Sequence, residues 1–141
     1  MRVSTIICAN NPRPDHLRRV VDALKAQILP REKWELLLVD NASTEPLAGQ
    51  VDLSWHALAR HVRMEELGLT SARLCGIGAA TADLLVFIDD DNVLEPSYLE
   101  VAIEVADKYP FLGAWGGSIE PEFEVTSPSW IYDYLYLLAV R

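Results

Sequence analysis

Three aspartates in a row, Asp89, Asp90 and Asp91, directly follow the apolar run Leu84–Ile88. Two like charges about 4 Å apart repel by roughly 1 kcal/mol in water, and by roughly 4 kcal/mol at an effective dielectric constant of about 20. Mg²⁺ or Mn²⁺ would offset that repulsion, because these ions take one or two protein carboxylates and complete their shells with water and phosphate oxygens. The triplet therefore predicts a divalent-cation site beside a phosphate-bearing ligand. The alternative is a solvated acidic turn ahead of the helix that begins at Pro96.

Two other polar pairs occupy the same kind of place in the sequence. Asn10 and Asn11 follow the first apolar run of the chain, and Asp40 and Asn41 end the second. In open α/β sheets, ligands bind outside the carboxyl ends of the strands. Because the ends of parallel strands meet at one edge, the three polar clusters predict one shared binding site.

An acidic metal site that binds a diphosphate also needs positive charge. Arg13 and Arg73 are the candidates. Arg73 lies in the first turn of a helix that Thr70 and Ser71 are expected to cap, where backbone N–H groups favour anions. The alternative for each arginine is a surface salt bridge.

The apolar runs that carry these clusters are short, which is typical of strands buried on both faces. Apolar residues at helical spacing, prolines and capping residues mark the segments between them. The predicted strands cover residues 3–8, 35–40, 61–64, 84–88 and 112–119. The predicted helices cover residues 17–28, 46–58, 70–80 and 96–108, and a last helical segment opens at Ser129. This alternation predicts an α/β fold, with three α/β/α layers around a mostly parallel sheet.

Composition narrows the class of protein. The chain has 141 residues, 12 of them Lys or Arg and 21 Asp or Glu, with a formal charge of −9. The length predicts one domain over residues 1–141, and the acidic balance argues against a nucleic-acid partner. Cys8 and Cys75 are expected to be free thiols in the cytoplasm, with contact to the inner face of a membrane left open. The apolar end at 135–140 leads us to expect a longer protein, of which this is the N-terminal portion.

Several common nucleotide-binding and catalytic motifs are missing from the sequence. Gly76-Ile77-Gly78 falls inside a helical pattern, so it predicts close packing rather than a dinucleotide loop. The sequence has neither a phosphate-binding loop that ends in Gly-Lys-Ser/Thr nor a Gly-x-Ser-x-Gly elbow. His16, His56 and His61 lack metal-ligand spacing and are interpreted as surface or packing residues.

In order and spacing, these motifs resemble glycosyltransferase family 2, which has the GT-A fold. Four segments carry the resemblance: residues 3–15, 36–44, 68–80 and 87–96. The last of them resembles the family's metal-binding Asp-x-Asp (DXD) turn. The sequence departs from the family pattern where Pro12 is inserted, where Asn41 replaces a more usual aspartate, and where Leu74 and Cys75 replace an Asn-x pair.

The resemblance implies a donor site and a reaction. The metal ligands it implies are Asp91 and Asp89, which would hold Mn²⁺ or Mg²⁺. The donor is a nucleotide-diphosphate sugar of UDP or GDP type, and a saccharide, lipid or protein hydroxyl displaces the diphosphate with inversion. Residues 115–118 resemble the start of the acceptor side. The implied nucleotide-sugar-binding residues are Cys8, Ala9, Asn11, Asp40, Asn41, Arg73, Asp89 and Asp90.

The resemblance names no general base in this chain. The family's base aspartate lies in a later segment, and the acidic residues of the C-terminal third do not match its motif. We therefore expect the donor half of an enzyme, inactive alone. Two alternatives stay open: a fragment without catalysis, which binds nucleotide or self-associates through residues 130–140, and a metal-dependent phosphotransfer domain. The latter would need an aspartyl nucleophile or a catalytic glutamate near the first strand.

Overall fold

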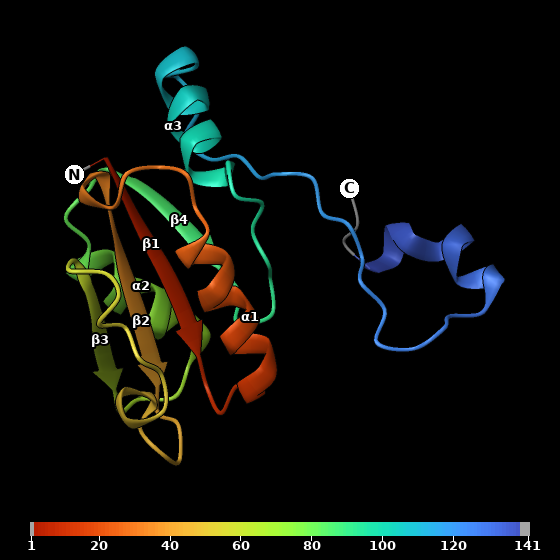
Figure 1. Cartoon of the computed structure of the whole chain (residues 1–141), viewed down its shortest axis with the longest axis horizontal. Helices are drawn as coiled ribbons and strands as arrows, with labels where there is room; N and C mark the ends of the chain where they lie inside the picture. Colours follow the sequence, from red (N-terminus) through yellow and green to blue (C-terminus); the bar gives the residue numbers. More distant parts are fainter. Residues whose placement is uncertain (1, 139–141) are drawn as a thin grey trace. The chain divides into compact units, whose positions relative to one another are not determined.

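The computed structural model describes residues 2–138, and the chain divides into two units, residues 1–109 and 110–141. Among residues 2–109, parallel strands form a four-stranded sheet in the order β3-β2-β1-β4 (Figure 1). The strands are β1 (Val3–Ala9), β2 (Trp34–Asn41), β3 (Ala59–Met64) and β4 (Leu84–Ile88). The prediction of an α/β fold with a parallel sheet is confirmed, whereas the single domain over 1–141 stays a prediction.

The four strand predictions in this unit are confirmed. The run at 84–88 is β4 without change, and the runs at 3–8 and 35–40 each extend by one or two residues. The predicted strand at 61–64 is the last four residues of β3. Apolar character identified the two central strands because β2 is buried over its whole length and β1 over nearly all of its length.

Helices cover both faces of the sheet. They are α1 (Pro14–Lys25), α2 (Leu69–Ala79) and α3 (Tyr98–Lys108). Figure 1 shows α1 in front of the sheet and α2 behind it, and the buried residues of α3 belong to the same core cluster as those of α1. Alternate residues of one strand therefore serve two cores: Ile7 packs on the α1 side, and Ile6 packs on the α2 side.

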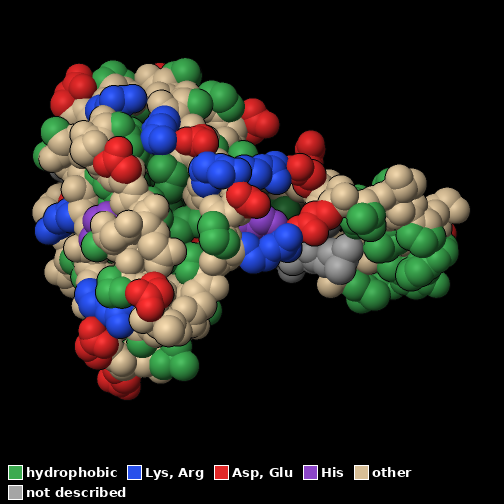
Figure 2. All heavy atoms as spheres, turned by 60° about the horizontal axis from the view of Figure 1, so that its bottom comes forward, with side chains coloured by type: hydrophobic (Ala, Val, Ile, Leu, Met, Phe, Trp, Pro, Cys, Tyr) green, Lys and Arg blue, Asp and Glu red, His purple; other side chains and the backbone are tan. Residues whose placement is uncertain are grey.

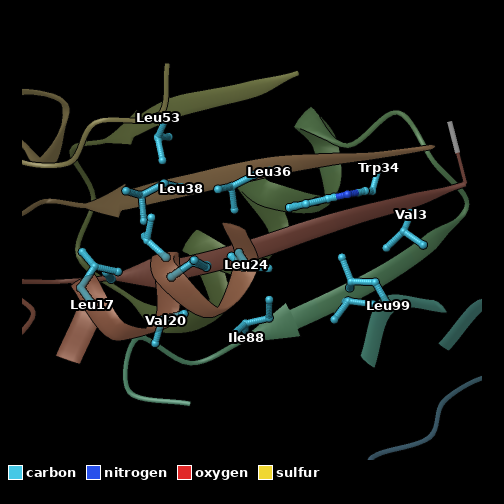
Figure 3. Packing of buried hydrophobic residues seen from close by; sticks show 14 of the residues in the cluster. Val3, Leu17, Val20, Leu24, Trp34, Leu36, Leu38, Leu53, Ile88 and Leu99 are labelled. Carbon is cyan, nitrogen blue, oxygen red and sulfur yellow. The ribbon is translucent and has the colours of Figure 1, made fainter. Parts of the chain in front are cut away.

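The larger core lies between α1 and the sheet. Figure 3 shows Leu17, Val20 and Leu24 of α1 facing the strand residues Leu36 and Leu38. Full burial of each such side chain contributes roughly 1.5–3 kcal/mol. This core fixes the position of α1 on the sheet, and so fixes the start of α1 beside the carboxyl end of β1.

Helix α2 lies close to the sheet because a glycine faces it. A Cβ atom added at Gly76 would lie 2.5 Å from Cγ2 of Ile6. The prediction of close packing inside a helix is confirmed for Gly76, whereas a Cβ added at Gly78 would meet no atom within 4 Å. The predicted cap at Thr70 and Ser71 is wrong, because the helix already begins at Leu69 after Gly68.

Three other predicted helices differ from the structure. The helix predicted at 17–28 is α1, which begins and ends three residues earlier. The predicted weak helix at 46–58 is wrong: the segment has only a 3₁₀ turn, η2 (Leu47–Gly49), followed by turns. One cause is local, since the carboxylate of Asp52 accepts a hydrogen bond from the N–H of Ser54 at 2.8 Å and so offers the backbone a turn in place of a helix. Helix α3 begins at Tyr98 rather than at Pro96.

The second unit is described over residues 110–138. The predicted strand at 112–119 is wrong, because within these residues no strand is present for it to pair with. The predicted last helical segment is the 3₁₀ helix η3 (Ser129–Leu138). The predicted self-association surface, 130–140, includes two residues outside the described part, and it stays a prediction. Across residues 2–138, no helix has both the length and the apolar character that a membrane span requires.

The close approach of α2 gives a matched pair of glycine substitutions. Gly76→Ala should lower the free energy of unfolding by about 1–3 kcal/mol, because its Cβ must displace Ile6. Gly78→Ala should raise it by about 0.5–1 kcal/mol, because that helical position has open space around it. Urea unfolding of both variants measures the difference, and equal effects would contradict the packing of α2.

Candidate functional site

The three polar clusters lie at one edge of the sheet. Ala9 pairs with Asp40, and Ile7 pairs with Ile88, so the ends of β1, β2 and β4 are nearly level. This edge is at the lower end of the sheet in Figure 1. The chain passes from β1 to β2 on one side and places β4 on the other, so β1 is the topological switch point at which such sheets bind ligands.

Asp40, the penultimate residue of β2, has a buried carboxylate that accepts several hydrogen bonds. The residue is 2% exposed. Its Oδ1 accepts a hydrogen bond from the N–H of Ser43 at 3.0 Å, and its Oδ2 accepts hydrogen bonds from the N–H of Leu47 at 3.0 Å and from Nη1 of Arg63 at 2.7 Å. Asp40 therefore folds the following segment, residues 42–47, back onto the end of the strand. This segment is called the β2 loop below.

Burial and hydrogen bonding act in opposite directions on Asp40. Burial by itself would raise the pKa of this carboxyl. The hydrogen bonds from Leu47, Arg63 and Ser43 outweigh it and lower the pKa to about 2. Asp40 is therefore ionised at neutral pH, and its charge holds the β2 loop.

Asn41 and Asn10 link β2 to its neighbours. Asn41 is 5% exposed, and its Oδ1 accepts a hydrogen bond from the N–H of Gly68 at 3.1 Å, just ahead of α2. Nδ2 of Asn10 donates to the carbonyl of Asn41 at 2.7 Å and to that of Ala42 at 3.3 Å. The end of β2 is thus tied to the start of α2 and to the loop after β1.

Asn11 makes a second connection between the loops after β1 and β2. Its N–H donates to Oγ of Ser43 at 3.0 Å, and its Oδ1 accepts from the N–H of Thr44 at 2.9 Å. Asn11 and Ala42 both have a positive φ, 45° and 57°. Asparagine tolerates this conformation, whereas for alanine it costs roughly 1–2 kcal/mol. Strain of this kind persists only where surrounding contacts hold it, and it clusters at functional sites.

Cys8, Arg73 and Asp89 gather on the α2 side of the site. Nη2 of Arg73 lies 3.6 Å from Oδ1 of Asp89, and its guanidinium is 6.0 Å from the ring centre of Phe87. Burial raises the pKa of the Cys8 thiol to about 11, although the charge of Arg73 opposes the shift. The thiol is therefore protonated at neutral pH. Ala9 is buried, and its neighbour Asn10 is exposed.

The aspartate triplet lies in the turn after β4. Asp89 and Asp91 are exposed, and Asp90 is partly buried. Burial raises the pKa of Asp90, and the charges of Asp91 and Asp89 raise it further. Over residues 2–138, no group of three or more His, Cys, Asp or Glu side chains could hold a metal ion. A metal on Asp89 and Asp91 would therefore need oxygen ligands from its substrate or from water, and the metal stays a prediction.

Of the other residues singled out in the sequence, Arg13 lies close to the candidate site and His56 belongs to the packed core. Arg13 stands at the N-cap of α1, next to the loop after β1. His56 packs its ring 4.3 Å from that of Trp34, which confirms its interpretation as a packing residue.

Figure 2 shows acidic and basic side chains interspersed over the visible face of the first unit.

Arg63 belongs to this site, and the sequence analysis did not include it. Its register partner on β2 is Asp40. An acidic residue opposite a basic one on neighbouring strands predicts an ion pair. This signal could be used only with the register of β3, a strand in which half of the residues are polar. Ser43 and Gly68 were missed as hydrogen-bonding partners for a similar reason, because only the folded loops bring them to Asn11 and Asn41.

The depressed pKa of Asp40 gives a pH-dependent prediction. A folded-state pKa near 2, against an ordinary value of 3.8, means stability that is present above about pH 4 and lost as the pH falls through about 2. Asp40→Asn should therefore lower the free energy of unfolding by about 2 kcal/mol at neutral pH. The difference in the free energy of unfolding between Asp40→Asn and the parent chain should become smaller as the pH falls. Urea unfolding across this range measures it, and a gap that does not change with pH would contradict the role of the charge.

The curated relatives of this chain include glycosyltransferases. It is 26% identical over 145 residues to a glucosyl-dolichyl phosphate glucuronosyltransferase of Haloferax volcanii, with 98% of this chain and 44% of the relative covered. It is 31% identical over 101 residues to glycosyltransferase AglE of the same organism, with 70% of this chain and 33% of the relative covered. The chain thus spans less than half the length of these relatives.

Solved structures share the fold of about three quarters of this chain. S. aureus TarS 1-349 superposes with a TM-score of 0.69 at 20% identity, over 78% of this chain and 33% of that one, and was also solved with UDP-GlcNAc. A mannosyltransferase of Pyrobaculum calidifontis, solved with GDP-Man and Mn²⁺, gives a TM-score of 0.63 at 26% identity. It matches 74% of this chain and 31% of its own. The first likeness, at its low identity, speaks for the GT-A fold alone.

A family model also matches this chain over nearly its whole length. The family model described as glycosyl transferase family 2 matches residues 4–138, a range that covers most of each unit and all three polar clusters. The resemblance seen in the motifs is thereby confirmed, and the chain belongs to glycosyltransferase family 2.

Proposed function

We propose that this chain binds the nucleotide-diphosphate part of a sugar donor at the carboxyl ends of β1, β2 and β4. The observation that carries the proposal is the meeting of three polar clusters at the switch point of the sheet, in a member of a glycosyltransferase family. The reaction would be transfer of the sugar to an acceptor hydroxyl by the longer enzyme.

The nucleoside would lie against the loops after β1 and β2. These loops are joined by the hydrogen bonds of Asn10 and Asn11. In this proposal Asn11, Asn41 and the backbone at Cys8 and Ala9 face the base and ribose. Asp40 acts through the β2 loop, since its own carboxylate is occupied by that loop and by β3.

The diphosphate would lie between α2 and the turn after β4. Arg73 stands there with its guanidinium partly exposed, 3.6 Å from Asp89. Two features favour an anion at this place. One is the positive charge of Arg73, and the other is the N-terminus of α2 with its exposed backbone N–H groups. Asp89 and Asp90 would border the ribose and the metal in this arrangement.

The donor atoms present at the triplet suit Mn²⁺ or Mg²⁺. Asp89 and Asp91 offer exposed carboxylate oxygens, which these hard cations prefer, and a diphosphate would complete the shell. Mn²⁺ accompanies GDP-Man in the Pyrobaculum structure. When bound, the ion would stabilise the negative charge of the departing diphosphate. Asp91, as the main ligand, and Asp89 would orient it, and Arg73 would add a second positive charge.

Direct displacement with inversion at the anomeric carbon is the reaction we propose for the complete enzyme. A general base must lie within hydrogen-bonding reach of the acceptor hydroxyl. We assign that role to no residue of this chain, so the chain would supply donor binding and the metal site. The acceptor class, whether saccharide, lipid or protein, and a location in the cytoplasm remain predictions, and contact with a membrane surface stays open.

A metal-dependent phosphotransfer domain fits the site less well. That chemistry would need an aspartyl nucleophile after β1 or a catalytic glutamate near it. The residues after Ala9 are Asn10 and Asn11, whose amides are not nucleophiles of this kind. A nucleotide-binding fragment without catalysis is the second candidate, because the chain spans 44% of its Haloferax volcanii relative.

Melting temperature offers a test of the donor site. UDP or GDP together with Mn²⁺ should raise the melting temperature of the chain more than either component alone, because metal and diphosphate complete each other's contacts. Saturation at about 100 times the dissociation constant corresponds to roughly 2.7 kcal/mol of stabilisation. Asp91→Ala should abolish the joint effect.

Asp83→Ala is the matched control, because Asp83 is an exposed aspartate at the opposite end of β4. It should leave the joint effect intact. If no nucleoside diphosphate shifts the melting temperature in the presence of Mn²⁺, the donor site is wrongly assigned. An equal loss in both variants would instead contradict the role of Asp91.

A further inference from the structure

The edge strand β3 carries two arginines, and each is paired with a buried carboxylate of β2. Nη2 of Arg60 lies 2.9 Å from Oε2 of Glu35, and Nη1 of Arg63 lies 2.7 Å from Oδ2 of Asp40. Both carboxylate side chains are 4% exposed. The two pairs have the same chemistry, but they lie at opposite ends of the sheet.

The Arg60 pair fastens the end away from the candidate site. Oε1 of Glu35 accepts hydrogen bonds from Oγ of Ser4 at 2.6 Å and from the N–H and Oγ1 of Thr81, both at 2.7 Å. Arg60 also donates to the carbonyl of Ala79, at the last residue of α2. This cluster therefore holds the connection from α2 to β4.

The Arg63 pair holds the β2 loop. The nitrogen that contacts Asp40, Nη1, also donates to the carbonyl of Ser43 at 2.9 Å. Oδ1 of Asp40 in turn accepts from the N–H of Ser43, so both backbone polar groups of that residue are held. Oγ of Ser43 then accepts the N–H of Asn11 at 3.0 Å, which carries the connection to the loop after β1.

We propose that Arg63 is a positioning residue for nucleotide binding: it fixes the β2 loop in its binding conformation by bridging the Asp40 carboxylate and the Ser43 carbonyl. The inference rests on the proposed function, since it concerns the same donor site. The β2 loop needs an external hold, because Ala42 within it has a φ of 57°, which alanine otherwise disfavours. Arg63 need not touch the ligand to act in this way.

The size of the effect follows from populations. A ligand that binds only one loop conformation has an apparent dissociation constant raised in proportion to the loss of that conformation. If removal of Arg63 leaves the β2 loop in its binding conformation about a tenth of the time, the dissociation constant rises about tenfold. Loss of Arg60 should weaken folding without that effect, because its contacts lie at the other end of the sheet.

The experiment compares Arg63→Ala with Arg60→Ala in the full 141-residue chain. Calorimetric titration with UDP and with GDP, each with Mn²⁺, gives the dissociation constant, and thermal unfolding gives the stability of the same samples. Arg63→Ala should raise the dissociation constant about tenfold, and Arg60→Ala should leave it within about twofold while lowering the melting temperature at least as much. Arg63→Lys, which keeps the charge, should recover part of the affinity.

The possible outcomes separate the positioning role of Arg63 from the proposed function. Unchanged affinity in Arg63→Ala, or equal loss in both alanine variants, would overturn the positioning role and leave the donor site standing. If the parent chain binds neither nucleotide, the proposed function itself fails and this inference fails with it. Should Arg63→Ala prove unfolded, the two lysine variants decide: a weaker affinity in Arg63→Lys than in Arg60→Lys supports the role, and equal affinities overturn it.

Discussion

The buried charge of Asp40 is the interaction on which the candidate site depends. A carboxylate removed from water is stable only where hydrogen bonds replace its lost hydration. Asp40 obtains them from the backbone of its own loop and from Arg63 of the neighbouring strand. To satisfy this one charge, the chain after β2 must turn back at once, and that turn brings Ser43 to the loop after β1.

A second buried carboxylate, that of Glu35, is stabilised by hydrogen bonds at the other end of the sheet, where it holds the scaffold rather than the candidate site. Glu35 gathers Ser4, Thr81 and Arg60 around a second buried carboxylate, and thereby fixes where α2 ends and β4 begins. Close packing at Gly76 then sets the distance between α2 and the sheet. The Glu35 cluster and the packing at Gly76 together set how α2 lies relative to β4. This arrangement brings Arg73 of α2 within 3.6 Å of Asp89, which follows β4. The scaffold and the site thus share one device, which is a buried β2 carboxylate paired with an arginine of β3.

The sequence could predict those parts of the fold whose signal is local. A fully apolar run identified β4, and polar residues directly after such runs identified the candidate site. The strand at 112–119 was predicted wrongly because a strand exists only with a partner, which composition does not reveal. Arg63 was missed because β3 is an edge strand with Arg or His at half of its positions, and its pairing register became visible only in the fold.

The most direct measurement of the central claim is a crystal structure of this chain soaked with a nucleotide sugar and Mn²⁺. The donor-site proposal predicts electron density for the base beside Asn11 and Asn41, and for the diphosphate between Arg73 and a metal held by Asp91 and Asp89. Density for the nucleotide away from the carboxyl ends of β1, β2 and β4, or for a metal that these aspartates do not contact, would contradict it.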